Sequence, residues 1–194
     1  MDNKKLRQCF GNFATGIIIA TGNNNYCQNN KYLKFINNIF GKIKILNSRI
    51  DQKNNIANYQ NLYGLTINSF SSLSLNPPLI QFSIDNKSSN LKFFKKNNYF
   101  LLNILSKSQL KLSNAFATKN NSNKFQIEDF KISKFGNPIF KNSLAYFECQ
   151  KYKIIKAGDH HIIIGKIIDF NQLSNQDPLL YYKGQYICAG DKIS

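Results

Sequence analysis

Apolar residues along the chain come in short blocks separated by polar residues, a pattern that predicts many strands and few helices. The first block, 6–13, carries Leu, Cys and Phe side chains at helical spacing and predicts an amphipathic helix that Gly16 ends. A β-rich run at 17–21 follows it. The chain therefore opens with a helix and then a strand.

The remaining blocks extend this pattern to the C-terminus. The run at 162–168 is nearly continuous in β-branched residues and suits a central strand. A strand and a turn are expected at 65–75, further strands at 79–84, 99–105, 146–155 and 179–186, and short helices at 88–96 and 108–117, the latter with Leu112, Ala115 and Phe116 inward. The 194 residues suffice for one buried core. We therefore expect a single, mainly β domain, a barrel covered by short helices.

The segment 22–63 departs from this regularity, because it is rich in Asn, Lys and Tyr. A structureless loop of that length would be unusual inside a compact domain. The segment is therefore expected to be either a small surface hairpin or a mobile insertion.

The formal net charge of +16 raises the question of nucleic acid binding. Arg7 and Arg49 are the only arginines, and the lysines are scattered among asparagines and isoleucines. Such a bias indicates drift in genome composition, and arginine-rich clusters with stacking aromatics are missing. We expect no nucleic acid partner, although anionic nucleotides should be attracted to the protein.

Cysteine usage and hydropathy bear on location. Cys9, Cys27, Cys149 and Cys188 form no CxxC pair, so neither a zinc site nor a dithiol motif is expected. No apolar run reaches the roughly 18 residues of a membrane span, and no signal peptide is recognisable. These features predict a cytoplasmic protein without membrane association.

Common catalytic motifs are absent from the sequence: there is no GxGxxG after a strand, Walker loop, GxSxG or HExxH. His160 and His161 form the only histidine pair. Neighbours on a strand point to opposite faces, so they cannot easily bind one metal ion. No metal site is expected.

A cluster of small polar residues is the most informative feature of the chain. Hydroxyls and amides beside exposed backbone N–H groups suit the pyrimidine edge of a flavin, which presents acceptors and a donor. The alternative is a turn-rich hairpin with hydroxyl-capped turns, which explains the polar residues alone more simply. The cluster comprises Thr66, Asn68, Ser69, Ser71 and Ser72 before Pro77-Pro78, and Ser83, Asp85, Lys87, Ser88 and Ser89 after it.

Lys87-Ser88-Ser89 adds a candidate phosphate site to this cluster. Ser88 has the character of a helix N-cap, and Leu91 and Phe94 follow at helical spacing. A helix N-terminus offers unpaired N–H groups to an anion. The plain alternative is a capped surface helix.

At this point the sequence resembles the flavin reductase-like domain family, which includes the small reductase components of two-component monooxygenases. The most specific match is GLTINSFSS at 64–72 followed by LNPPL at 75–79. Further matches are FATG at 13–16, NIL at 103–105 with Gln109, FA at 116–117, GNP at 136–138, AGDH at 157–160 with Gly165, and PLLYY at 178–182 with Gly184 and Tyr186. The family usually has a short hairpin where this chain has segment 22–63.

The resemblance implies a homodimeric split β-barrel that binds FMN or FAD near the subunit interface. It implies that hydride passes from the nicotinamide C4 of NADH or NADPH to flavin N5, and that a partner monooxygenase receives the reduced flavin. The residues it implicates are Thr66, Asn68, Ser69 and Ser71 at the flavin ring, Ser83, Lys87, Ser88 and Ser89 at the phosphate, Asn103 as a further polar contact, His160 at the nicotinamide as the catalytic candidate, and Tyr182 and Tyr186 as dinucleotide contacts.

The sequence leaves two questions open, namely the turnover of NAD(P)H and the role of the insertion. The protein could bind or carry flavin without efficient turnover of NAD(P)H. The 22–63 insertion could cover the flavin, alter the dimer contact, contact a partner oxygenase, or be neutral.

Overall fold

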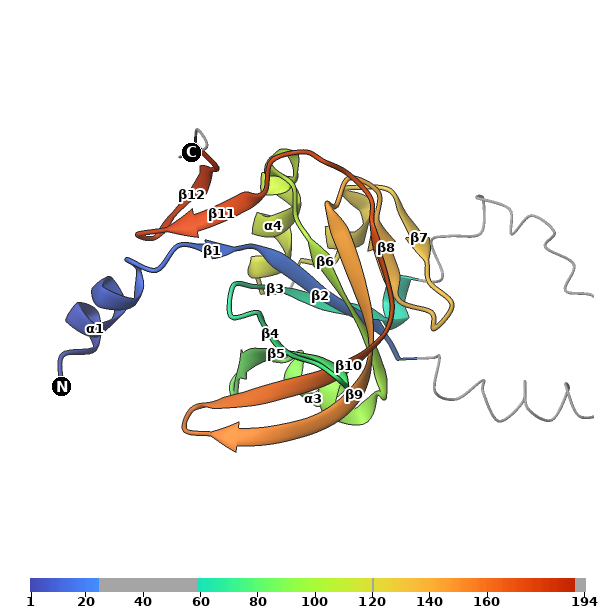
Figure 1. Cartoon of the computed structure of the whole chain (residues 1–194), viewed down its shortest axis with the longest axis horizontal. Coiled ribbons are helices and arrows are strands. Elements are labelled where there is room, and N and C mark those ends of the chain that lie inside the picture. Colours follow the sequence, from blue (N-terminus) through green and yellow to red (C-terminus); the bar gives the residue numbers. More distant parts are fainter. Residues whose placement is uncertain (25–58, 120, 191–194) are drawn as a thin grey trace, which may run out of the picture.

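The computed structural model describes residues 1–24, 59–119 and 121–190 (Figure 1). Its centre is a seven-stranded antiparallel sheet that curls around the core and stays open between its two edge strands in the described residues. The strand order is β3 (Leu62–Ile67), β2 (Ile18–Asn23), β6 (Tyr99–Ile104), β9 (Ala145–Ala157), β10 (His160–Gln172), β5 (Pro78–Asp85) and β4 (Ser71–Leu75). This architecture confirms the mainly β split barrel expected from the sequence.

Short helices and a small two-stranded sheet complete the barrel. Helix α3 (Leu91–Lys96) covers one end, and the one-turn helix η2 (Lys107–Gln109) leads into α4 (Leu110–Ala117). After α4 come the one-turn helix η3 (Lys124–Gln126) and the pair β7 (Phe130–Ile132) and β8 (Pro138–Phe140). The insertion expected over 22–63 lies mostly outside the described residues, since 25–58 fall between the first two ranges.

A separate arm projects from the barrel and carries both ends of the described chain (Figure 1). It contains α1 (Asn3–Phe10) and a three-stranded sheet of β1 (Thr15–Gly16), β11 (Leu179–Tyr182) and β12 (Gln185–Cys188). The carboxylate of Asp2 caps α1 by accepting bonds from the backbone N–H groups of Lys4 and Lys5 at 2.8 and 3.2 Å. The structure confirms a first helix but places it earlier than predicted, because α1 ends at Phe10 with Gly11 at its C-cap, so Phe13 lies outside it.

The predicted single strand at 179–186 is wrong, because this run is the hairpin of β11 and β12. The chain turns at Lys183 and Gly184, whose φ angles are 49° and 82°. Two left-handed residues in succession make the tight turn that matches the twist of paired strands. The tyrosines on both sides of the turn hid it in the hydropathy pattern.

The core contains two main clusters of buried side chains. In the first, the rings of Phe82, Phe94 and Phe100 pack edge to face, with centroids 5.6–5.9 Å apart, and Ile163 of the central strand β10 lies with them. The second lies under α4, whose Leu112, Ala115 and Phe116 face inward as predicted. Burial of these faces holds α3 and α4 against the sheet.

Gly165 allows the closest packing inside the sheet. A Cβ atom at this position would lie 2.5 Å from Cζ of Phe100 and 2.9 Å from Cβ of Cys149. The pairing of β10 with β9 also shifts its register between Ile164 and Gly165. The hydrogen of glycine is therefore what lets β10 lie against the aromatic cluster.

The predicted N-cap of helix α3 is wrong. Helix α3 begins at Leu91 with Asn90 at the N-cap, and the Asn90 side chain makes no capping bond. Ser88 instead belongs to a preceding turn, in which its N–H donates to the carbonyl of Asp85 at 2.9 Å. Its hydroxyl accepts a bond from the N–H of Asn90 at 3.3 Å, so it stabilises the turn.

A buried carboxyl group, Glu148 of β9, joins the barrel to the β7–β8 connection. Its Oε1 accepts bonds from Nδ2 of Asn137 at 3.0 Å and from the hydroxyl of Ser133. Its Oε2 is buried and has no hydrogen-bond partner in the described structure. Burial, as the largest effect, raises the pKa of Glu148 above its usual value.

This raised pKa predicts a specific pH dependence of stability. Between the ordinary pKa of a glutamate and the raised value, the folded state binds more protons than the unfolded state, so stability falls as pH rises through this window. We expect Glu148→Gln, which cannot ionise, to lose less stability than the wild type between pH 4 and pH 8 in urea unfolding. If the glutamine amide itself changes the stability of the fold, it shifts the free energy of unfolding by the same amount at every pH and leaves the pH dependence unaffected. A difference in unfolding free energy that is the same at every pH would contradict the prediction.

Candidate functional site

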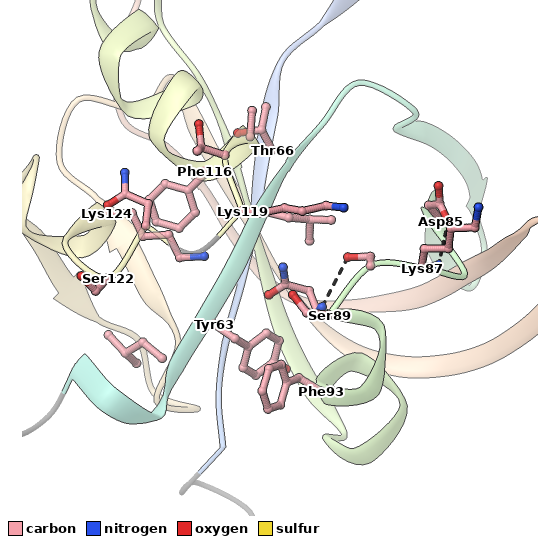
Figure 2. A pocket seen from close by; sticks show the side chains of 17 residues that line it. Tyr63, Thr66, Asp85, Lys87, Ser89, Phe93, Phe116, Lys119, Ser122 and Lys124 are labelled. Atoms are coloured by element: carbon pink, nitrogen blue, oxygen red, sulfur yellow. Dashed lines mark hydrogen bonds between the residues drawn. The ribbon is translucent and has the colours of Figure 1, made fainter.

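A cavity of about 460 Å³ opens beside β3, between the loop that follows β5 and the segment that follows α4 (Figure 2). Its lining combines aromatic rings, hydroxyl groups and lysine side chains, the mixture of an apolar body and a few polar groups that characterises ligand sites. The lining residues are Leu62, Tyr63, Leu65, Thr66, Asp85, Lys87, Ser88, Ser89, Asn90, Phe93, Phe116, Ala117, Thr118, Lys119, Asn121, Ser122 and Lys124.

Among these described lining residues, positive charge exceeds negative charge. Lys87, Lys119 and Lys124 stand against one carboxylate, that of Asp85. Figure 2 shows Lys87 and Lys124 on either side of β3, so the positive charges come from two separate parts of the chain. The Asp85 Oδ1 atom accepts a 2.7 Å bond from the backbone N–H of Lys87, which orders the loop after β5. A cavity of this charge and size favours an anionic ligand such as a phosphate ester.

Lys124 is anchored in the wall of the cavity by its environment. Its Nζ donates a 2.7 Å bond to the carbonyl of Gly64 on β3 and lies 4.9 Å from the ring centroid of Phe116. A Cβ on Gly64 would come within 2.9 Å of both the Phe116 ring and the Ala20 carbonyl, so glycine at this position allows the Phe116 ring to pack against the backbone of β3. Burial lowers the pKa of Lys124. Two of the three ammonium donors remain for a bound anion.

Four of the residues predicted at the cofactor line this cavity: Thr66, Lys87, Ser88 and Ser89. The hydroxyl of Thr66 donates to the carbonyl of Ser113 on α4 at 2.7 Å. Sequence reasoning did not single out Lys119 and Lys124. Lysines occur throughout this chain, so nothing distinguished these two except their position beside the FA pair at 116–117.

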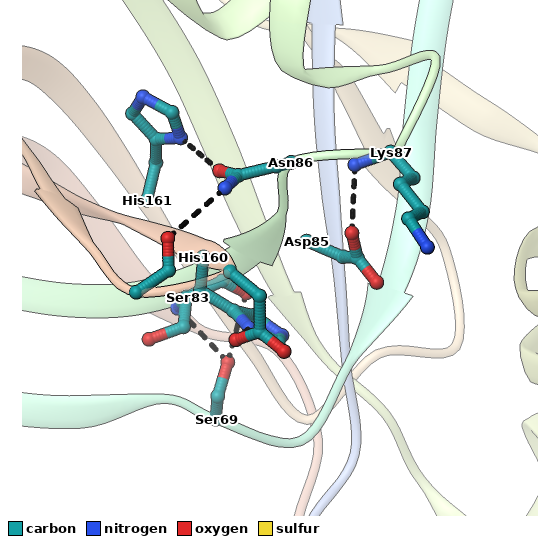
Figure 3. Close-up of polar contacts among 9 residues, drawn as sticks. Ser69, Ser83, Asp85, Asn86, Lys87, His160 and His161 are labelled. Carbon is teal, nitrogen blue, oxygen red and sulfur yellow. Dashed lines mark hydrogen bonds and ion pairs between the residues drawn. The ribbon is translucent and has the colours of Figure 1, made fainter.

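Another group of predicted residues lies next to the cavity, at the turn between β3 and β4. Ser69 links this turn to β5, because its Oγ accepts from the N–H of Ser83 at 2.9 Å and donates to the carbonyl of Ser83 at 3.2 Å. Asn68 and Ser71 are exposed beside it. None of these residues is among the described residues that line the cavity, and they form an open polar rim beside it. Figure 3 shows Ser69 and Ser83 next to His160.

His160 begins β10 directly opposite Asp85 of β5, a residue of the cavity lining. Side chains of directly opposite residues lie on the same face of a sheet. The Nδ1 atom of His160 is 2.7 Å from Oδ1 of Asp159, and this hydrogen bond lowers the pKa of Asp159. The register of β5 and β10 therefore brings His160 to the edge of the cavity.

His161 makes different contacts from its neighbour, as expected for adjacent residues of a strand. Its Nδ1 is 2.6 Å from Oδ1 of Asn86, whereas His160 contacts Asp159 (Figure 3). Burial lowers the pKa of His161, and the charges of Lys95 and Lys156 lower it further. The two imidazoles thus have separate environments.

The prediction that Asn103 contacts a cofactor is not supported by its position. Its side chain is fully buried, with Oδ1 accepting from the N–H of Phe140 at 3.0 Å and Nδ2 donating to the carbonyl of Pro138 at 3.2 Å. These bonds tie β6 to β8. A buried amide whose oxygen and nitrogen both form hydrogen bonds with the backbone has a structural role.

Tyr182 and Tyr186 lie on the arm hairpin and are not among the residues that line the cavity. The hydroxyl of Tyr186 is 2.9 Å from that of Ser113 on α4, so this tyrosine joins the arm to the barrel. The ring of Tyr182 lies 5.1 Å from the ammonium group of Lys183. Within one chain, neither tyrosine reaches the cavity.

Two further observations concern other kinds of site. In the described residues, no three His, Cys, Asp or Glu side chains come together in a group that could hold a metal ion. The helices of this part of the chain are also too short or too polar to cross a membrane.

Comparison with known proteins identifies the family. The model of the flavin reductase like domain matches residues 48–188. A flavin reductase of Pseudomonas putida is 35% identical over 123 residues, 63% of this chain and 72% of that protein. The reductase component of a flavin-dependent trigonelline monooxygenase of Acinetobacter baylyi is 39% identical over 63% of this chain.

The structural comparison agrees with the sequence match. The crystal structure of flavin reductase HpaC complexed with NADP+ superposes with a TM-score of 0.71 at 29% identity, covering 96% of this chain and 97% of that one. The chain spans only 39% of the Acinetobacter protein and 52% of a relative from Rhizobium meliloti. The matched segment covers six of the seven described barrel strands, all except β2, together with the cavity and the Asp159-His160 pair, and on this basis the chain belongs to the flavin reductase-like domain family.

Proposed function

We propose that the protein is an NAD(P)H-dependent flavin reductase, which binds FMN or FAD at the cavity beside β3 and supplies reduced flavin to a partner monooxygenase. The observation that carries the proposal is the position of this cationic, hydroxyl-lined cavity at the edge where Asp159 and His160 begin β10. Membership of the family and the names of the relatives support the same activity.

The donor set of the cavity fits a flavin phosphate. The lysine ammonium groups and the hydroxyls of Ser88 and Ser89 are donors for phosphate oxygens. The polar rim of Asn68, Ser69 and Ser71, with Ser83 beside it, would then contact the edge of the ring system. The bound flavin supplies the chemistry, because its ring accepts the hydride. The protein contributes binding, orientation and exclusion of water.

His160 would orient the nicotinamide dinucleotide. Its Nδ1 is occupied by Asp159, which leaves Nε2 for a polar group of the ligand, such as the carboxamide or a phosphate oxygen. The lysines would also draw the anionic dinucleotide toward the site.

The described residues favour neither FMN over FAD nor NADH over NADPH. The expected cytoplasmic location also stays a prediction.

A test of the activity is anaerobic mixing of the purified protein with FMN and NADH, followed by the loss of flavin absorbance. We expect bleaching well above a blank without enzyme. We expect His160→Ala to raise KM for NADH about tenfold, the equivalent of one lost hydrogen bond of about 1.4 kcal/mol. Asn171→Ala, an exposed variant at the far end of β10, is the control and should behave as the wild type.

Failure of the wild type to bleach FMN with either NADH or NADPH would contradict the reductase proposal. Tight flavin binding in the same experiment would then support the alternative, a protein that carries flavin without turnover. Unchanged kinetics of His160→Ala in an active protein would remove the nicotinamide role of this residue.

The cavity can be tested by flavin binding alone. We expect Lys87→Met and Lys124→Met each to raise the Kd for FMN about tenfold, because each removes a charge-assisted bond of about 1.5 kcal/mol from the phosphate. Quenching of flavin fluorescence measures the Kd. Lys131→Met, an exposed lysine on β7 that is not among the described lining residues of the cavity, is the control. Equal affinities for FMN in all these proteins would show that the phosphate binds elsewhere.

We also propose that the protein acts as a homodimer in which the arm embraces a second copy. Phe10 and Phe13 of the arm are 66% and 78% exposed, and large apolar groups on a projecting element indicate a contact surface. Light scattering after size exclusion should give twice the 22.3 kDa mass of the chain.

The arm contributes to this dimer in a testable way. We expect the double variant Phe10→Ser and Phe13→Ser to shift the protein toward the monomer, since it removes apolar contact area of the arm. Phe170→Ser, equally exposed at 69% but located on the barrel, is the matched control. A monomeric wild type at micromolar concentration would exclude the proposed dimer.

A further inference from the structure

One side chain, that of Asn86, joins the turn between β9 and β10 to the loop that follows β5 (Figure 3). Its backbone N–H donates to the carbonyl of Asp159 at 2.9 Å, which extends the pairing of β5 and β10 by one residue. Its Nδ2 donates to the carbonyl of Gly158 at 3.2 Å, and its Oδ1 lies 2.6 Å from Nδ1 of His161. Two hydrogen bonds of Asn86 thus hold the turn that precedes His160, and a third joins Asn86 to His161 on β10.

The contacts of Asn86 determine which nitrogen of His161 carries a proton. The Gly158 carbonyl can only accept, so it selects the amide orientation with Nδ2 toward it. Oδ1 then faces His161 and can only accept, so Nδ1 of His161 must donate. Burial and the nearby charges of Lys95 and Lys156 lower the pKa of His161 and favour the neutral ring. The expected state is the neutral tautomer protonated at Nδ1.

The turn has few other contacts that could fix its position. Strand β5 pairs with β10 up to the first residue of β10, where Asp85 lies opposite His160, so only the turn residues Gly158 and Asp159 lie beyond the regular strand pairing. Gly158 has a φ of 58°, and Asp159 is exposed. Apart from the bond between Asp159 and its neighbour His160, the described hydrogen bonds of these two turn residues outside the strand pairing come from Asn86, through its backbone N–H and its Nδ2.

The loop that lines the cavity is held by other bonds. The N–H of Lys87 donates to Oδ1 of Asp85 at 2.7 Å, and the N–H of Ser88 donates to the Asp85 carbonyl at 2.9 Å. The Asn86 side chain takes no part in either bond. Its removal should consequently loosen the turn of the hairpin and leave the phosphate-binding side of the site in place.

We propose that Asn86, oriented by His161, is a positioning residue that fixes the Gly158–Asp159 turn and thereby sets the place of His160 over the cavity. The proposal rests on the nicotinamide role of His160 in the proposed function. Asn86 and His161 act through His160 and need not touch either nucleotide. His161 thus orients the amide of Asn86, and Asn86 in turn positions His160.

The kinetic test compares three variants in steady-state reduction of FMN by NADH. Asn86→Ala should raise KM for NADH about fivefold, whereas the Kd for FMN, measured by fluorescence quenching, should change less than twofold. His161→Leu should act in the same direction with a smaller effect, since it leaves the bond to Gly158 in place. The control Asn171→Ala, on the same strand as His161, should leave both constants unchanged.

A second measurement needs neither flavin nor activity. The chain has two histidines, so long-range 1H–15N spectra of the imidazoles contain two sets of signals, and the set lost in His161→Leu belongs to His161. We expect His161 protonated at Nδ1 in the wild type, and a shift toward the Nε2-protonated form in Asn86→Ala. Exchange of the backbone N–H of residue 86, which donates to the Asp159 carbonyl, should also become faster in Asn86→Ala than in the wild type.

The outcomes distinguish this proposal from the proposed function. Absence of NADH-dependent reduction by the wild type would remove the function, while the spectra and the exchange rates would still test the contact of Asn86 with the turn. His161 protonated at Nε2 in the wild type would overturn the proposal. So would an unchanged KM for NADH in Asn86→Ala of an active protein, or a Kd for FMN that rises as much as KM, because a general loss of structure would then explain the effect.

Discussion

The pairing of β10 with β9 on one side and β5 on the other is the constraint on which the structure depends. It places Ile163 in the aromatic cluster of the core and His160 opposite Asp85 at the end of the same strand. A shift of one residue would turn every side chain of β10 to the other face. Gly165 helps to exclude such a shift, because only a hydrogen fits beside Phe100.

The same pairing explains why the candidate site stands at one end of the barrel. Strand β5 ends at Asp85, and the loop beyond it carries both the cavity-lining residues Lys87 to Ser89 and the turn contact Asn86. Strand β5 is paired with β10 up to Asp85, whereas the loop after Asp85 is held by individual hydrogen bonds. The paired strands therefore form a rigid support, and the loop carries side chains that can adjust to a ligand. Such a support suits a site that must orient two nucleotides in sequence.

The long barrel strands and the inward face of α4 could be predicted from the sequence, because both depend on the local spacing of apolar residues, whereas the three-residue strands β7 and β8 are too short to show such a pattern. The errors have local causes too. Ser88 looks like a helix cap, but Asp85 engages its N–H in an earlier turn, and the tyrosines around Lys183 concealed a hairpin. Asn103 lies inside a matching segment, yet its neighbours Pro138 and Phe140 are distant in sequence. Only the fold shows that its amide is used by the backbone.

Part of the candidate site could be located from the sequence, since the cavity-lining residues Thr66, Lys87, Ser88 and Ser89 stand in recognisable segments. Lys119 and Lys124 could not, because a lysine gains significance only from what surrounds it, here the Gly64 carbonyl and the Phe116 ring. The contact between Asn86 and His161 joins residues 75 positions apart and has no signature in the linear chain.

The cavity is walled by three stretches of chain, around residues 62–66, 85–93 and 116–124, that are otherwise joined mainly through the sheet. A ligand seated there would act as a cross-link between them, and binding to the folded state alone adds to its stability by mass action. The resistance of this protein to unfolding and proteolysis would then rise and fall with the nucleotide supply of the cell, so that its abundance would follow the availability of its own cofactor.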